Sequence, residues 1–172
     1  QYLINHNTYA MKTTDDSSEY KTVSINRTFD LPVNTIWKAW TEPESFKKWW
    51  GPYDYTCPYC NIDLRIGGQC HASMKNKKDD VETFSIGTYK EIVENKKLVV
   101  TDSFADGKGN IIDAPEGFPG NWPKELLITV DLKEQDGKTS LHMTQGPMPV
   151  EMYEDCIKGW NECFDKMRDN LK

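Results

Sequence analysis

The chain has 172 residues, 37% of them hydrophobic and 12% aromatic, which predicts one globular domain with a single core. Its formal net charge of −6 leaves no broad basic surface, which argues against nucleic acid and against an anionic membrane as partners. No apolar run approaches the roughly 20 residues of a membrane span, and the start of the sequence has neither the basic nor the apolar region of a signal peptide.

The first part of the chain predicts a leader, a strand and two short helices. Residues 1–19 are polar and without period, so we expect a flexible leader there and a single domain over 20–172. From Tyr20 the segment YKTVSINRTFDLP alternates between two faces, which predicts a strand. Residues 32–43 carry apolar side chains at helical spacing between two prolines, and PESFKKWW predicts a second, shorter helix before Gly51.

The middle of the chain predicts antiparallel strands. Alternation and β-branched or aromatic residues mark the segments CNIDLRI, QCHASMK, ETFSIGTYKEIV, KLVVTDSFA, ELLITVDLKE and TSLHMTQ. Gly67–Gly68, the segment ENKK and Asp136–Gly137 lie between consecutive strands and predict tight turns. Residues 106–124 are dense in glycine and proline, which predicts a long loop.

The chain ends in a predicted amphipathic helix from about Val150 to Leu171. At 1.5 Å per residue it would be roughly 33 Å long, enough to cross a curved sheet. A sheet with one apolar face must cover that face, and this is the only long amphipathic element that the pattern predicts. We therefore expect an α+β domain in which about six to seven antiparallel strands curl around the helix. The apolar stripe of the helix consists of Tyr153, Cys156, Ile157, Trp160, Cys163, Phe164, Met167 and Leu171.

Several motifs occur in an order typical of one protein family. FDLPVNTIWKAWTEPESFKKWWGP is similar to an opening motif F-x-A-P, W-x-A-(W/F)-T-x-P and W-W-G-P, and CNIDLRIGG is similar to C-x-x-D-L-R-x-G-G. GTYKEIVENKKLVVTDSF and the closing Gly159–Trp160 continue the likeness, which spans about Lys21 to Leu171. Together they resemble the family named after the activator of heat-shock protein 90 ATPase, within the START-like and birch-allergen-like (SRPBCC) superfamily. The resemblance implies the helix-grip fold, with a cavity between sheet and C-terminal helix.

The same resemblance implies a small hydrophobic or amphipathic ligand in that cavity. We expect no cofactor, and our first hypothesis is a binding protein and not an enzyme. A second hypothesis is a cyclase- or hydrolase-type enzyme that uses His71, Asp63 or Tyr89 as the polar group in the cavity. A third is a chaperone- or stress-associated interaction module, with a chaperone as its partner.

The candidate ligand-binding residues are aromatic, sulfur-containing or histidine side chains on the predicted helix, strands and loop. Each also has a structural interpretation, as part of the core or of a surface hydrogen bond. Phe118 and Trp122 lie in the loop at 106–124, where large aromatic rings are costly to expose, so we expect this loop to cover the mouth of the cavity. The candidates are Trp50, His71, Tyr89, Phe104, Trp122, Met143, Tyr153, Cys156, Trp160 and Cys163.

Cys57 and Cys60 have the spacing of a glutaredoxin active site. The attacking thiol of such an enzyme lies at a helix N-terminus, but here a predicted strand follows Cys60. A metal site would need Cys70 or His71 as well, and these strand neighbours point to opposite faces, which leaves at most three ligands. We therefore expect neither a thiol–disulfide enzyme nor a metal site, and the family resemblance implies that Cys60 is a small buried residue. The odd count of five cysteines also lacks the spacing of a secreted disulfide scaffold, which favours a cytoplasmic location.

Overall fold

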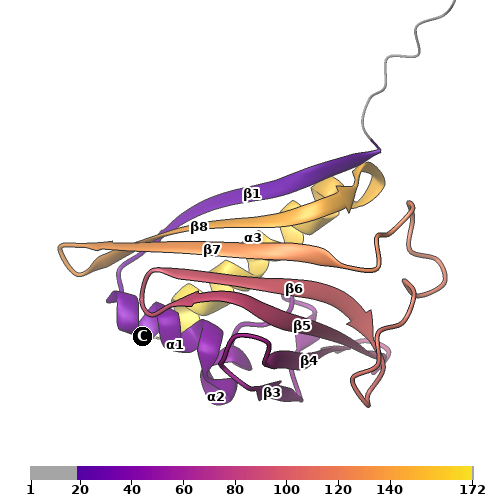
Figure 1. Ribbon diagram of the computed structural model, residues 1–172, viewed down its shortest axis with the longest axis horizontal. Coiled ribbons are helices and arrows are strands. Elements are labelled where there is room, and N and C mark those ends of the chain that lie inside the picture. Colours follow the sequence, from indigo (N-terminus) through magenta and orange to yellow (C-terminus); the bar gives the residue numbers. More distant parts are fainter. Residues whose placement is uncertain (1–18, 172) are drawn as a thin grey trace, which may run out of the picture.

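A computed structural model describes residues 19–171, and Figure 1 shows a sheet curled around a long helix. The predicted leader at 1–19 lies, apart from Glu19, outside the described residues. All strand pairs in this part of the chain are antiparallel. The strand order is β1 (Tyr20–Phe29), β8 (Lys138–Pro149), β7 (Leu126–Gln135), β6 (Lys97–Ala105), β5 (Glu82–Val93), β4 (Gln69–Asn76) and β2 (Tyr55–Thr56), and β3 (Cys60–Ile62) also pairs with β4.

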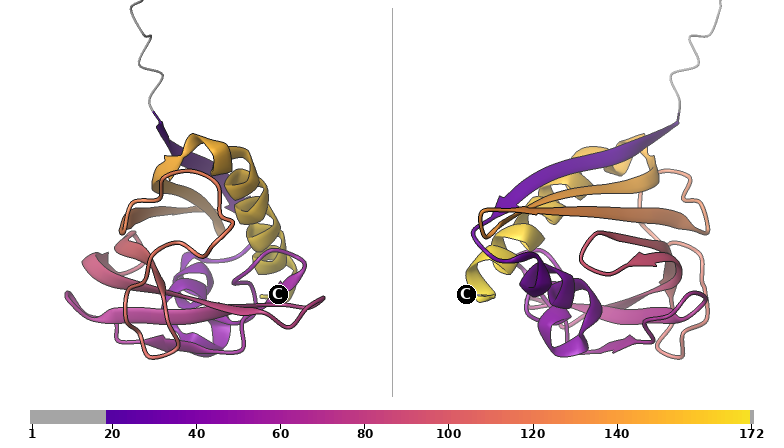
Figure 2. Two further views of the ribbon diagram at one scale, coloured as in Figure 1. Left: turned by 90° about the vertical axis from the view of Figure 1, so that its right-hand side faces the viewer. Right: turned by 60° about the vertical axis from the view of Figure 1, so that its left-hand side comes forward.

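The helices lie where the sequence places them. α1 (Val33–Thr41) starts directly after Pro32, and α2 (Pro43–Phe46) starts with its own proline. A short 3-10 turn (Val150–Met152) leads into α3 (Tyr153–Asn170), which crosses the concave face of the sheet (Figure 2). The predicted α+β helix-grip architecture is thus confirmed, with seven strands on the main path of the described sheet.

An aromatic cluster joins the short helices to α3. The side chain of Trp49 is fully buried, and its indole Nε1 donates to the carbonyl oxygen of Ala39 at 2.8 Å. Its ring lies 4.7 Å from that of Trp40, 5.3 Å from that of Phe46 and 6.2 Å from that of Phe164, centroid to centroid. Large rings packed in this way bury much apolar area, so they fix α1 and α2 against the C-terminal half of α3.

Polar contacts fix the position of α3 along the sheet. Arg27 of β1 reaches Asp165 at 2.7 Å, and the hydroxyl of Tyr53 donates to the same carboxylate at 2.6 Å. The ammonium group of Lys166 donates to the carbonyl oxygens of Gly51 at 2.8 Å and of Tyr55 at 3.1 Å. The segment before β2 is thereby attached to the helix.

Two predicted elements are shorter than the pattern indicates. The strand expected through Ile66 ends at Ile62, because the backbone turns where Arg65 pairs with Asp63 at 2.8 Å and Gly67 adopts a positive φ of 81°. α2 ends at Phe46, and the chain continues in turns through Trp49.

Candidate functional site

A cavity of about 30 Å³ lies between the sheet and the two short helices. The rings of Trp40, Phe46 and Trp50 form one wall, and residues of β4 to β7 form the other. A space of this volume accommodates one or two water molecules. Any larger guest therefore needs room that is not open in this state.

Asp102 is the acidic group of the cavity wall. Along β6 the inward positions are Leu98, Val100 and Asp102, so a carboxyl stands where the alternation calls for an apolar side chain. Burial raises the pKa of Asp102, and the hydrogen bond from Gln145 opposes that shift. Within residues 19–171 no lysine, arginine or histidine forms an ion pair with this carboxyl. When this carboxyl is ionised, no positively charged side chain of the described residues therefore pairs with it.

A chain of hydrogen bonds connects Asp102 to α3. The indole Nε1 of Trp160 donates to the Oε1 atom of Gln145 at 2.7 Å, and Nε2 of Gln145 donates to Oδ2 of Asp102 at 2.8 Å. Both Trp160 and Gln145 are buried. In this series of hydrogen bonds, the carboxyl of Asp102 is the final acceptor.

Two indole N–H groups at the cavity lack a partner. Trp40 is 3% exposed and Trp50 is 7% exposed, and the Nε1 atom of neither has a hydrogen-bond partner among the described residues. Buried polar groups are almost always hydrogen-bonded, and a buried indole usually finds an acceptor. The residues of the cavity wall thus combine one carboxyl with two unpartnered donors.

Sulfur and hydroxyl groups complete the wall. Cys70 and Tyr89 both line the cavity. A hydrogen bond from Cys60 lowers the pKa of the Cys70 thiol, with a smaller contribution from Tyr89, while burial opposes the shift. Burial raises the pKa of Tyr89, which makes its hydroxyl a weak acid. Burial likewise raises the pKa of Cys57 to about 11.

The Cys-Pro-Tyr-Cys segment does not have the geometry of a thiol–disulfide active site. Cys60 is the first residue of β3, so no helix begins at this thiol. All five cysteines are free thiols in the structure. Within the described part of the chain, no group of three or more His, Cys, Asp or Glu side chains is arranged to hold a metal ion.

The candidate residues from the sequence fall into different environments, and two of them, Trp50 and Tyr89, line the cavity. Trp160 does not line the cavity but contacts residues that do. It donates a hydrogen bond to Gln145, and its ring centroid lies 6.0 Å from that of Trp40 and 5.5 Å from that of Trp50.

The remaining candidates on α3 and β8 lie elsewhere in the core. Met143 and Cys163 are buried there. The Sγ atom of Cys156 lies 3.5 Å from the sulfur of Met148, and the ring of Tyr153 lies beneath the ammonium of Lys21 at 4.8 Å. The apolar side chains of α3 therefore pack in the core beside the cavity, while the region of the short helices supplies the aromatic wall of the cavity.

His71 lies on the opposite face of β4 from Cys70. Its Nε2 atom is 3.0 Å from the carbonyl oxygen of Asp106, and its ring contacts those of Tyr59 and Phe84, with centroids 5.1 Å and 5.5 Å away. His71 therefore holds the start of the long loop and does not line the cavity.

The loop between β6 and β7, residues 106–125, covers one end of the curled sheet, as the left view of Figure 2 shows. The ring centroid of Phe104 lies 5.4 Å from that of Phe118 and 5.2 Å from that of Trp122. Gly120 touches Pro149 so closely that a side chain at this position would collide with it. A hollow of about 370 Å³ lies within the loop, and loop residues alone line it. The aromatic contacts make the loop a cover for the end of the sheet near the start of α3.

The sequence analysis did not select Asp102, Gln145 or Trp40. A signal for the first two was present: each continues a run of apolar inward positions, after Val100 in β6 and after Met143 in β8. A polar residue at such a position predicts a buried polar group.

A curled antiparallel sheet that encloses a long C-terminal helix and a small internal cavity defines the helix-grip class. The family model described as "Activator of Hsp90 ATPase homolog 1-like protein" matches residues 30–172, and the chain belongs to this family. None of the helices in the described residues is long and apolar enough to cross a membrane.

Solved structures agree with this fold. Protein CV1439 from Chromobacterium violaceum is 22% identical with a TM-score of 0.73, over 87% of this chain and 96% of that chain. Protein Ms6760 from Mycobacterium smegmatis is 22% identical with a TM-score of 0.71, over 88% and 90%. The AHSA1 protein from Silicibacter pomeroyi is 16% identical with a TM-score of 0.68, over 88% and 97%. The comparison with curated proteins found no match.

Proposed function

We propose that the protein binds a small amphipathic molecule between the sheet and the short helices. The supporting observation is the set of polar groups at the cavity: the carboxyl of Asp102 and the indole N–H groups of Trp40 and Trp50. Burying an N–H group without a partner costs free energy, and an ionised carboxylate has more acceptor positions than the one that Gln145 fills, so this wall suits a guest with polar atoms of its own. Membership of the family supports the fold but does not identify the molecule that is bound.

The guest reaches the cavity past the loop at 106–125. The space of about 30 Å³ holds only a small head group, so the body of the guest must displace part of its surroundings. The contacts of Phe104 with Phe118 and Trp122 are the ones that a shift of the loop would open. Loops on a rigid sheet commonly carry this role, because they move without disturbing the core.

The other predictions from the sequence stay predictions. A cytoplasmic location, the absence of a cofactor and a chaperone partner belong to this group. For the enzyme hypothesis, Tyr89 lines the cavity, whereas Asp63 pairs with Arg65 in an exposed turn and His71 faces the other side of the sheet.

Native mass spectrometry of the protein purified from its own cells tests the proposal. We expect a population with the added mass of one small molecule, which is lost when the protein unfolds. The matched variant Asp102→Asn should retain less of that molecule, because it changes the polar wall with little change of volume. If wild type and variant both carry only the mass of the polypeptide, the proposal is wrong.

A further inference from the structure

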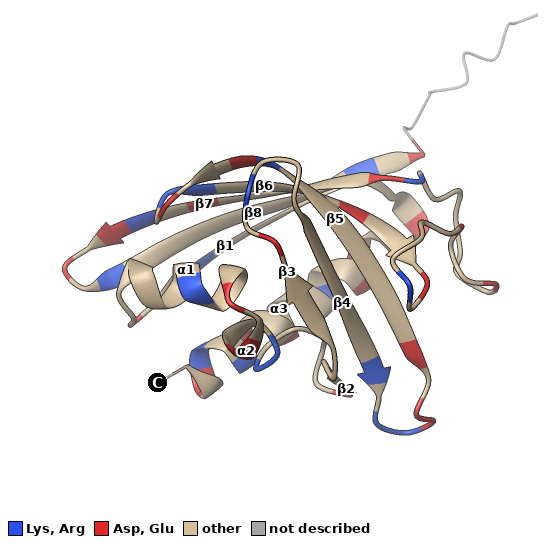
Figure 3. Cartoon of the chain, turned by 60° about the horizontal axis from the view of Figure 1, so that its bottom comes forward, with Lys and Arg blue, Asp and Glu red and all other residues tan. Residues whose placement is uncertain are grey.

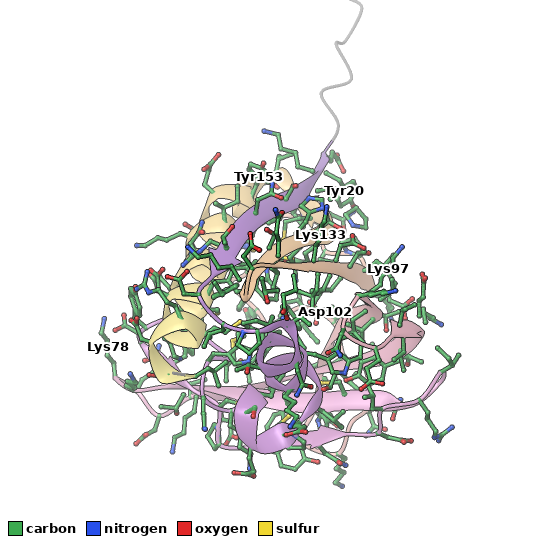
Figure 4. All side chains as sticks on the ribbon, turned by 90° about the vertical axis from the view of Figure 1, so that its left-hand side faces the viewer. Tyr20, Lys78, Lys97, Asp102, Lys133 and Tyr153 are labelled. Atoms are coloured by element: carbon green, nitrogen blue, oxygen red, sulfur yellow. The ribbon has the colours of Figure 1, made fainter. Side chains whose placement is uncertain are left out.

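The carboxyl of Asp102 has no positively charged side chain beside it in the described part of the chain. Figure 4 shows it inside the curl of the sheet, while Lys78, Lys97 and Lys133 lie toward the outside. Figure 3 shows the charged residues spread over the helices, strand ends and turns. Desolvation and the hydrogen bond from Gln145 account for the shifted pKa of the carboxyl, and no described cation contributes to it.

The other titratable groups near Asp102 are two thiols and a phenol, none of which can carry a positive charge. Cys70 on β4 and Cys156 on α3 both interact electrostatically with its carboxylate, and Tyr89 of β5 lines the same cavity. Burial raises the pKa of Cys156 to about 11 and raises the pKa of Tyr89 as well. These two groups stay neutral near pH 7, and ionisation of Cys70 would only add negative charge. The described neighbours thus cannot neutralise Asp102, but a cationic guest can.

The hydrogen-bonding capacity of Asp102 points to a guest rich in donors. An ionised carboxylate has about four acceptor positions and donates nothing. The amide of Gln145 fills one position at Oδ2, and its direction is fixed because its oxygen accepts from Trp160. A primary ammonium group carries three donors, and charge-assisted hydrogen bonds of this kind are stronger than neutral ones.

The aromatic wall and the size of the cavity fit the same head group. Faces of tryptophan and phenylalanine rings attract cations, and Trp40, Phe46 and Trp50 supply such rings here. About 30 Å³ accommodates an ammonium group, which is close to water in size, and excludes a trimethylammonium group. The net charge of −6 also raises the local concentration of cations around the protein.

The body of the guest has an apolar path beside this head group. Phe104 follows Asp102 by two positions on the same face of β6, about 7 Å along the strand. Its ring meets those of Phe118 and Trp122 in the covering loop. We infer that the protein binds small primary amines with an aromatic or aliphatic body, holding the ammonium group at Asp102 and the body along Phe104; this inference rests on the proposed function.

Calorimetric titration with four probes of one shape tests the inference: 2-phenylethylamine, 2-phenylethanol, 3-phenylpropanoate and the trimethylammonium derivative of the amine. We expect the amine to bind at least ten times more tightly than the alcohol, and the anion and the trimethylammonium probe to show no binding. In Asp102→Asn the affinity for the amine should fall at least tenfold, to the level of the alcohol, whose own affinity is unchanged. The binding of the amine to wild type should also weaken as the pH falls through the raised pKa of Asp102.

Failure of the inference differs from failure of the proposed function. If the alcohol or the anion binds as tightly as the amine, or if Asp102→Asn leaves the affinity for the amine unchanged, the protein binds ligands but the ammonium site is wrong. Equal affinity for the trimethylammonium probe would overturn the selection of a primary amine. If none of the four probes binds, the ammonium site is wrong, and the native mass measurement alone then decides the proposed function.

Discussion

Gln145 of β8 reaches over β7 to donate a hydrogen bond of 2.8 Å to Asp102 of β6. The strand between them contributes Ile128, which pairs with Gln145 on one side and with Val100 on the other. The amide oxygen of Gln145 accepts from Trp160, so its nitrogen must face the carboxyl. One side chain thereby connects the long helix with the acidic wall of the cavity.

The replacement Asp102→Asn should stabilise the protein without ligand at neutral pH. Burial raises the pKa of Asp102 above its ordinary value of 3.8, so the folded protein binds more protons than the unfolded chain between those two pKa values. The stability of the wild type therefore falls as pH rises through that window, and the variant lacks this decrease. Urea unfolding from pH 4 to pH 8 should show the advantage of the variant growing with pH.

Asp131→Asn, an exposed change on β7, is the matched control and should alter the free energy of unfolding by less than about 0.5 kcal/mol. An advantage of Asp102→Asn that does not depend on pH would contradict the description of Asp102 as an acid whose pKa is raised by desolvation.

Lys166→Met should lower the free energy of unfolding by about 1–3 kcal/mol, because the carbonyl oxygens of Gly51 and Tyr55 lose a charged donor. Lys158→Met, on the exposed side of the same helix, should change it by about 0.5 kcal/mol or less. Chemical denaturation of both variants gives the comparison. Equal effects would mean that Lys166 does not hold the segment before β2.

Cys57 should react slowly with iodoacetamide in the folded protein. Its pKa of about 11 leaves about 0.1% of the thiol ionised at pH 8, against about 10% for a cysteine with the ordinary pKa of 9.0. Peptide mapping at timed intervals should therefore show labelling roughly 100-fold slower than that of free cysteine. Labelling as fast as free cysteine would return the Cys-Pro-Tyr-Cys segment to consideration as a thiol enzyme.

A bound guest should protect the loop from proteolysis. Glu116 is exposed within the loop, and a protease specific for glutamate cleaves after it. We expect a small-molecule extract from the protein's own cells to slow this cleavage several-fold, because a guest that contacts Phe104 also orders Phe118. Cleavage after Glu94, in the turn between β5 and β6, should keep its rate. An unchanged rate at Glu116 would show that the loop is no lid.

Most of the fold follows from local pattern. The strand from Tyr20, the strand from Lys97 to Ala105 and the final helix agree with the structure because their period, prolines and turn glycines all favour the same element. The strand expected through Ile66 was too long, since an alternating sequence does not reveal that Asp63 and Arg65 pair within a turn.

The candidate site was only partly predictable. Trp50 and Tyr89 were selected as large side chains near an expected cavity, and both line it. His71 was selected for its chemistry, but the side of the sheet that it faces depends on how β4 pairs with β3 and β5. The chain from Trp160 through Gln145 to Asp102 joins residues 43 to 58 positions apart in sequence from its acid, and only the tertiary structure brings them together.

Indole N–H resonances provide the most direct test of a guest at the cavity. A small-molecule extract from the protein's own cells is added, and a proton–nitrogen correlation spectrum is recorded. The indole signals of Trp40 and Trp50 should shift, because their N–H groups have no partner among the described residues. The signal of Trp49 should stay in place, because its N–H already donates to Ala39. Unmoved signals from Trp40 and Trp50, or equal shifts at Trp49, would contradict a ligand site between the sheet and the short helices.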